Sequence, residues 1–105
     1  MPDAFDVAVL VRSAGEPGLQ GLRCGLSLSL GDRVPRVYLV GAGLELLGAT
    51  AGSEAEAVLR SLVDEVGAGV VAESDGGGPA VPGVGRRRRA AILREVAGAR
   101  FQQVF

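Results

Sequence analysis

The stretch that decides the fold is Phe5-Asp6-Val7-Ala8-Val9-Leu10-Val11, an apolar run with one charge near its start, which Arg12-Ser13-Ala14-Gly15 closes. A run of this length, rich in valine and bounded by small residues, is typical of a β-strand that is buried on both faces. Such strands belong to parallel sheets that helices cover. Two later runs, Val37-Tyr38-Leu39-Val40 and Gly69-Val70-Val71-Ala72, have the same character.

Segments with helical spacing separate these strands. The pattern predicts helices over residues 16–30, 54–66 and 86–97, the second of them opened by a capping box of Ser53 and Glu56. Each helix should turn one apolar face inward. The residues expected on these faces are Leu19, Leu22, Leu26 and Leu30 in the first helix, Ala55, Val58, Leu59, Leu62, Val63 and Val66 in the second, and Ala90, Ile92, Leu93, Val96 and Ala97 in the third.

The remaining segments complete an alternating order of strands and helices. Residues 44–47 read as a short helical turn, residues 74–85 as a long loop rich in glycine and proline, and residues 101–105 as an edge strand with period-two alternation. This order predicts a three-layer α/β/α sandwich with a mainly parallel sheet of four to five strands. We expect residues 1–105 to form a single domain.

Composition limits the classes of function. The chain has no His, no Lys and a single Cys, so it lacks the commonest general base, and no cluster of residues resembles a metal site. A net charge of −1 and few aromatic residues argue against nucleic-acid binding. No apolar run could span a bilayer, and residues 1–4 lack the basic start of a signal peptide. We therefore expect a soluble cytoplasmic protein with no cofactor and no membrane partner.

A ligand site in an open parallel sheet lies beyond the carboxyl ends of the strands. The turns predicted there are small and polar, which leaves room for a ligand, although tight turns need small residues in any case. The candidate ligand-binding residues are Ser13, Gly15, Gly41, Gly43, Glu73, Ser74 and Asp75. Gly41-x-Gly43 is not a dinucleotide fingerprint, because Leu46 stands where the third glycine would be.

Two further features have a functional and a structural interpretation. Cys24 could act as a sulfur carrier, but a position in the middle of a helix, away from its N-terminus, favours a small core residue. The run Arg86-Arg87-Arg88-Arg89 could bind an anion or an acidic partner. If it begins a helix, however, its side chains point around most of a turn, which favours a solvated helix start.

One stretch resembles a known family. The order of a strand, a Ser/Gly loop, the helix Gly21-Leu22-Arg23-x-Gly25-Leu26-x-Leu28-x-Leu30-Gly31-Asp32 and the strand Val37–Val40 is similar to that of DsrE/DsrF/DsrH-like sulfur-relay proteins. The resemblance implies a helix–sheet–helix sandwich that assembles into homo- or hetero-oligomers. Active members carry a persulfide on a cysteine in a loop after a later strand, and residues 73–85 contain no cysteine.

The resemblance therefore implies a divergent or non-catalytic member of that family. We expect an oligomeric subunit, or a module that binds a small ligand or a partner, with no catalytic residue. The alternative is a persulfide carrier that uses Cys24.

Overall fold

The core of the molecule is a sheet of parallel strands in the order β4-β3-β2-β1-β5. The computed structural model describes residues 5–31, 33–49, 52–65, 69–76 and 80–105. The strands are β1 (Val7–Val11), β2 (Pro35–Leu39), β3 (Gly69–Glu73), β4 (Val84–Arg87) and β5 (Phe101–Val104). All four pairings between neighbouring strands are parallel. The predicted parallel sheet is confirmed, and the 101–105 segment is an edge strand as expected.

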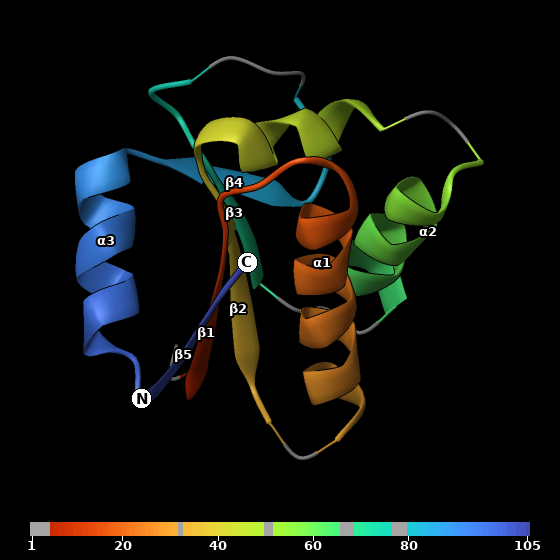
Figure 1. Ribbon diagram of the computed structural model, residues 1–105. Helices are drawn as coiled ribbons and strands as arrows, with labels where there is room; N and C mark the ends of the chain where they lie inside the picture. The colour runs from red at the N-terminus through yellow and green to blue at the C-terminus, as the bar shows by residue number, and fades with distance from the viewer. Residues whose placement is uncertain (1–4, 32, 50–51, 66–68, 77–79) are drawn as a thin grey trace.

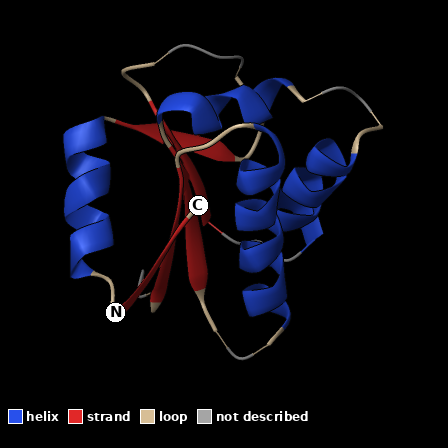
Figure 2. Cartoon of the chain, viewed as in Figure 1, coloured by secondary structure: helices blue, strands red, loops and turns tan. Residues whose placement is uncertain are grey.

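Helices cover both faces of this sheet, as Figure 1 and Figure 2 show. Helices α1 (Gly15–Leu30) and α2 (Glu54–Arg60) pack on one face, and α3 (Arg89–Gly98) packs on the other. A 3₁₀-helix, η1 (Gly41–Gly48), crosses the end of the sheet at which the strands finish. The predicted three-layer α/β/α sandwich is thereby confirmed.

The burial of β1 on both faces shows why helices cover both sides of the sheet. Its alternation places Val9 in the core under α1 and α2, and Ala8 in the core under α3, both fully buried. An apolar residue at every position suits a strand with helices on both sides. β2 behaves in the same way, with Val37 on the α1 side and Tyr38 on the α3 side.

α1 approaches the sheet through glycines. Gly18, Gly21 and Gly25 are buried, and a Cβ added at Gly21 or Gly25 would lie 2.6 Å from a valine methyl of β1 or β2. Leu22 is buried as predicted, but the expectation that Leu30 lies inward is wrong, because its side chain is 72% exposed. α1 reaches past the edge of the core in its last turn, so the leucine spacing continues beyond the surface that it could cover.

The second helix changes its winding part-way along. Ser53 Oγ accepts from the Glu56 N–H at 3.3 Å, which confirms the predicted N-cap, and Glu56 Oε1 accepts from the Gly52 N–H. The α-helix ends at Arg60 and continues as a π-helical turn, η2 (Ser61–Glu65). Val66, which we expected on the inward face, lies outside the described residues.

The segment before α3 corrects the sequence prediction. Residues 84–87 form strand β4 and pair with β3, so the predicted helix over 86–97 begins three residues too early and the 74–85 loop is shorter than expected. Ile92 and Val96 are buried, whereas Ala90, Leu93 and Ala97 are exposed. A single helix over this face buries only the narrow stripe that touches the sheet.

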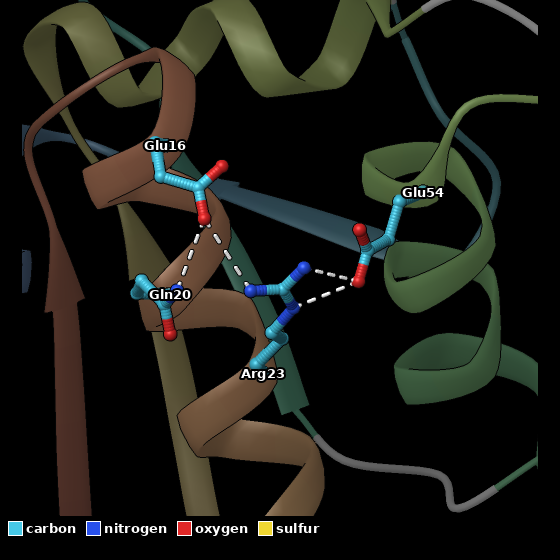
Figure 3. Close-up of polar contacts among 4 residues, drawn as sticks. All are labelled: Glu16, Gln20, Arg23 and Glu54. Atoms are coloured by element: carbon cyan, nitrogen blue, oxygen red, sulfur yellow. Dashed lines mark hydrogen bonds and ion pairs between the residues drawn. The ribbon is translucent and has the colours of Figure 1, made fainter.

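An ion-pair cluster fastens α1 to α2 (Figure 3). The Arg23 guanidinium donates from Nε to Glu54 Oε2 at 2.8 Å, makes a second contact with the same oxygen through Nη2, and lies 3.4 Å from Glu16 Oε2 through Nη1. Glu16 also accepts from Gln20. These contacts are largely exposed to solvent, so they orient the two helices more than they stabilise them.

Candidate functional site

The predicted site at the carboxyl end of the sheet is built around Glu73. This side chain, at the end of β3, is 3% exposed. Its Oε1 accepts from the Gly41 N–H at 2.9 Å, and its Oε2 lies 2.7 Å from Arg89 Nε. The hydrogen bond from Arg89 and that from Gly41 hold the pKa of the Glu73 carboxyl below its ordinary value. The carboxylate therefore joins β3, η1 and α3.

Asp75 belongs to the same cluster. Its Oδ2 accepts from the backbone N–H of Arg89 at 3.2 Å, which supplies an acceptor at the start of α3. Ser74 is exposed, and its N–H donates to the Arg87 carbonyl as part of the β3–β4 pairing. The structure thus brings Gly41, Glu73 and Asp75 together through Arg89, a residue that the sequence analysis assigned to a solvated helix start.

Local backbone geometry explains the small residues at the other predicted positions. Gly15 and Gly41 have φ of 64° and 54°, the left-handed region that favours glycine. A Cβ at Gly43 would collide with the Val11 carbonyl oxygen, and one at Gly18 would collide with that of Ser13. These close approaches favour the interpretation of Ser13, Gly15 and Gly43 as parts of tight turns.

The arginine run does not form one basic face. Arg86 donates to the Glu73 carbonyl at 2.9 Å, and Arg87 contacts the Glu95 carboxylate. Glu95 also accepts from the buried Tyr38 hydroxyl at 2.8 Å and lies 3.5 Å from Arg36. Burial acts to raise the pKa of Glu95, but the hydrogen bonds from Tyr38 and Arg87 bring it below its ordinary value. Arg86, Arg87 and Arg89 therefore bind this chain's own acceptors.

Cys24 lies on α1 with its side chain half-buried against the larger core. Burial raises the pKa of its thiol. A sulfur nucleophile works as the thiolate, which requires the opposite shift. The geometry of Cys24 therefore favours the core interpretation over the sulfur-carrier alternative.

A cavity of about 330 Å³ lies elsewhere, between η1, α2 with η2, and the segment that precedes β4. Its volume is at the lower end of the range of small-molecule pockets. Aliphatic side chains from these three segments line most of it. The lining residues are Leu46, Leu47, Ala49, Glu56, Leu59, Arg60, Val63, Asp64, Ala80, Val81 and Pro82.

Charged side chains of α2 and η2 form one wall of the cavity. Arg60 lies 3.1 Å from Glu56 Oε2 and 3.7 Å from Asp64 Oδ2, so two carboxylates share one guanidinium. This wall carries one net negative charge. Val63 and Asp64 come from the π-helical turn, a rare geometry that occurs frequently at functional sites.

This cavity was not predicted from the sequence. Leu59 and Val63 were expected on an inward helical face, and Val81 and Pro82 in a loop, which is correct for each segment alone. A signal was present in the apolar pair Val81-Pro82 within a loop rich in glycine, which suggests contact with the core. The gap between that pair and the helix depends on how the segments pack, and periodicity carries no information about it.

The fold and the cavity define the class: an α/β/α sandwich with a parallel sheet and a small apolar pocket beside one of its helices. Among solved structures it is similar to the ychN protein from E. coli, with a TM-score of 0.76 and 13% identity, over 97% of this chain and 100% of that one. The likeness supports the predicted α/β/α sandwich. At this level of identity the likeness concerns the fold alone.

No protein-family model and no curated protein matches the sequence. Within the described ranges, no group of three or more acidic, His or Cys side chains could hold a metal ion. Across the same residues, none of the helices has the length and apolar character needed to cross a membrane.

Proposed function

We propose that this chain is a divergent, non-catalytic DsrE-like protein that binds a small ligand in the cavity beside η1 and α2, and that it works as an oligomeric subunit in the cytoplasm. The cavity is the observation that carries the proposal. It combines a mostly apolar lining, partly open to solvent, with a charged wall, which is the usual composition of a small-molecule site.

The chemistry of the cavity indicates its ligand class. An aliphatic lining of about 330 Å³ suits an apolar body of modest size. The net negative wall of Glu56, Arg60 and Asp64 suits a cationic head group, since a ligand carboxylate there would meet like charge. We therefore expect a small aryl or alkyl amine to bind better than the corresponding acid.

Two observations support a non-catalytic role. Glu73 is already engaged by Arg89 and Gly41, so this carboxylate has a structural partner set. Cys24 has a thiol pKa that burial raises. The sulfur-transfer alternative needs a reactive thiolate, and a rapid reaction of native Cys24 with a thiol reagent would support it over the present proposal.

Calorimetric titration with phenethylamine and with phenylpropionate tests the proposal. We expect measurable binding of the amine and weaker binding of the acid. The variant Ala49→Phe, at the residue that follows η1, should fill the cavity and abolish binding. The variant Ala42→Phe, at an exposed position within η1, should leave binding unchanged. Three results would contradict the assignment: no binding of phenethylamine, binding of phenylpropionate that is as tight or tighter, or equal binding by the Ala49→Phe and Ala42→Phe variants.

A further inference from the structure

The two edges of the sheet carry different chemistry. β4 forms one edge and bears Arg86 and Arg87, and charged residues of this kind protect an edge from pairing with another chain. β5 forms the other edge. Its four residues are uncharged and exposed, with Phe101 43% and Val104 52% accessible. The strand β5 itself therefore lacks the charges that protect the β4 edge. The guanidinium groups of Arg33 and Arg100 lie beside it, 5.0 Å and 5.7 Å from the centre of the Phe101 ring.

Backbone groups of β5 point outward in a definite pattern. The Phe101 N–H donates to the Asp6 carbonyl at 3.0 Å and the Phe105 N–H donates to the Leu10 carbonyl at 2.8 Å, so these residues and Gln103 face β1. Since alternate residues of a strand direct their N–H and C=O groups to opposite sides, those of Gln102 and Val104 face away from the sheet. They are the groups that an added strand would meet.

The sequence of this edge is close to a palindrome centred on Gln103: Phe101-Gln102-Gln103-Val104-Phe105. In an antiparallel pair of two copies related by a twofold axis at Gln103, Gln102 of each copy lies opposite Val104 of the other. These are the residues with outward backbone groups, so the register forms a hydrogen-bonded pair at each of the two places. Phe101 then lies opposite Phe105 of the second copy.

The side chains fit the same register. Residues 101, 103 and 105 lie on the α1 face, because their partners on β1 include Val7 and Val9, which pack under that helix. Two aromatic cross-strand pairs would flank a pair of Gln103 amides on this face, and such aromatic pairs stabilise antiparallel strands. The twofold operation brings the same residues together from both copies, as an isologous dimer requires.

We infer that β5 is a docking edge for a second copy of this chain, which pairs with it antiparallel about Gln103 to join the two sheets into one. The inference rests on the oligomeric part of the proposed function and names the surface. The surface area that two short strands bury on pairing lies at the small end of the range for specific interfaces. We therefore expect a dimer that dissociates on dilution through the micromolar range.

Charge exchange at the twofold axis tests this inference by sedimentation velocity over a series of concentrations. Gln103→Glu and Gln103→Arg should each abolish the dimer, because each places two like charges opposite one another, and an equimolar mixture of the two should restore it. The control Ser27→Glu adds the same negative charge on an exposed face of α1 and should dimerise like the unaltered chain. Circular dichroism of each variant checks its folding.

Three results would overturn the inference: an unaltered chain that is monomeric at every concentration, folded Gln103 variants that dimerise normally, or a mixture that fails to restore the dimer. Binding of phenethylamine is measured separately. A monomer that binds the amine would refute the edge and leave the cavity assignment standing, and a dimer that does not bind it would do the reverse.

Discussion

Glu73 shows how one buried carboxylate can organise the end of a parallel sheet. Its carboxylate accepts a hydrogen bond from the Gly41 N–H of η1 and forms an ion pair with Arg89, the first residue of α3. Arg89 is 53% exposed at its side chain, so the pair lies at the boundary between the core and water. The contribution of this ion pair to the free energy of unfolding depends on the charge of Glu73, and that charge depends on pH.

Glu73→Gln should lower the free energy of unfolding at pH 7 by about 1–2 kcal/mol, since it removes charge-assisted hydrogen bonds. The folded pKa of Glu73 lies below its ordinary value of 4.5, so its contribution is present above that pH and is lost as pH falls through the folded pKa. Urea denaturation of both proteins at pH 7 and at pH 3 measures this. The difference in the free energy of unfolding between the unaltered protein and Glu73→Gln should be smaller at pH 3 than at pH 7. A difference that is equal or larger at pH 3 would contradict the role assigned to the carboxylate.

Cys24 should react slowly with a thiol reagent in the native state. Its side chain is half-buried and burial raises the pKa of the thiol, so less thiolate is present at pH 8. Ser27→Cys in a Cys24→Ser background places a thiol on an exposed position of the same helix. We expect the control to react more than about tenfold faster. Equal rates would favour the sulfur-carrier alternative.

Single residues divide into those that sequence predicts well and those that it does not. The valines of β1 were predicted as buried because an unbroken apolar run leaves few other possibilities. Arg89 was not predicted as the partner of Glu73, since the two are far apart in the chain and either could face water. Leu30 fits the leucine stripe of α1, yet the spacing does not say where the covering surface ends.

At the scale of elements, α1 depends on the small residues that face the sheet. Gly21→Ala and Gly25→Ala should each destabilise the protein by about 1–3 kcal/mol, because the added methyl would lie 2.6 Å from Val11 or Val37 and the gain in helix propensity is smaller. Gly98→Ala, with nothing within 4 Å of the added carbon, should be neutral or slightly stabilising. Thermal unfolding of the three variants measures the difference, and equal effects at Gly25 and Gly98 would refute the close approach.

The order of elements was largely predictable, and its one error is instructive. The run Arg86–Arg89 was assigned to a helix because four arginines carry no strand signal of their own. In the structure, Arg86 and Arg87 lie opposite Ala72 and Glu73 of β3, and their guanidinium groups reach the Glu73 carbonyl and the Glu95 carboxylate. Pairing with an existing strand and two local acceptors override the weak propensity of the segment.

At the scale of the whole molecule, the sandwich follows from strands that are apolar on both faces and helices that are apolar on one. The candidate site is less predictable, since the cavity arises where η1, the π-helical turn and the segment before β4 fail to fill the space between them. Its lining residues come from three separate parts of the chain. From the sequence, each lining residue could be predicted only as part of an apolar helix face or of a loop. The pocket itself results from how these segments pack together.

Ligand binding should take place in this cavity, and methyl-selective nuclear magnetic resonance during a titration with phenethylamine measures where it takes place. We expect chemical-shift changes concentrated on the methyl groups of Leu46, Leu47, Leu59, Val63 and Val81, and a titration curve that fits a single site. Changes centred instead on residues near Gly41 and Glu73 or on α1 around Cys24, or no changes at all, would contradict it.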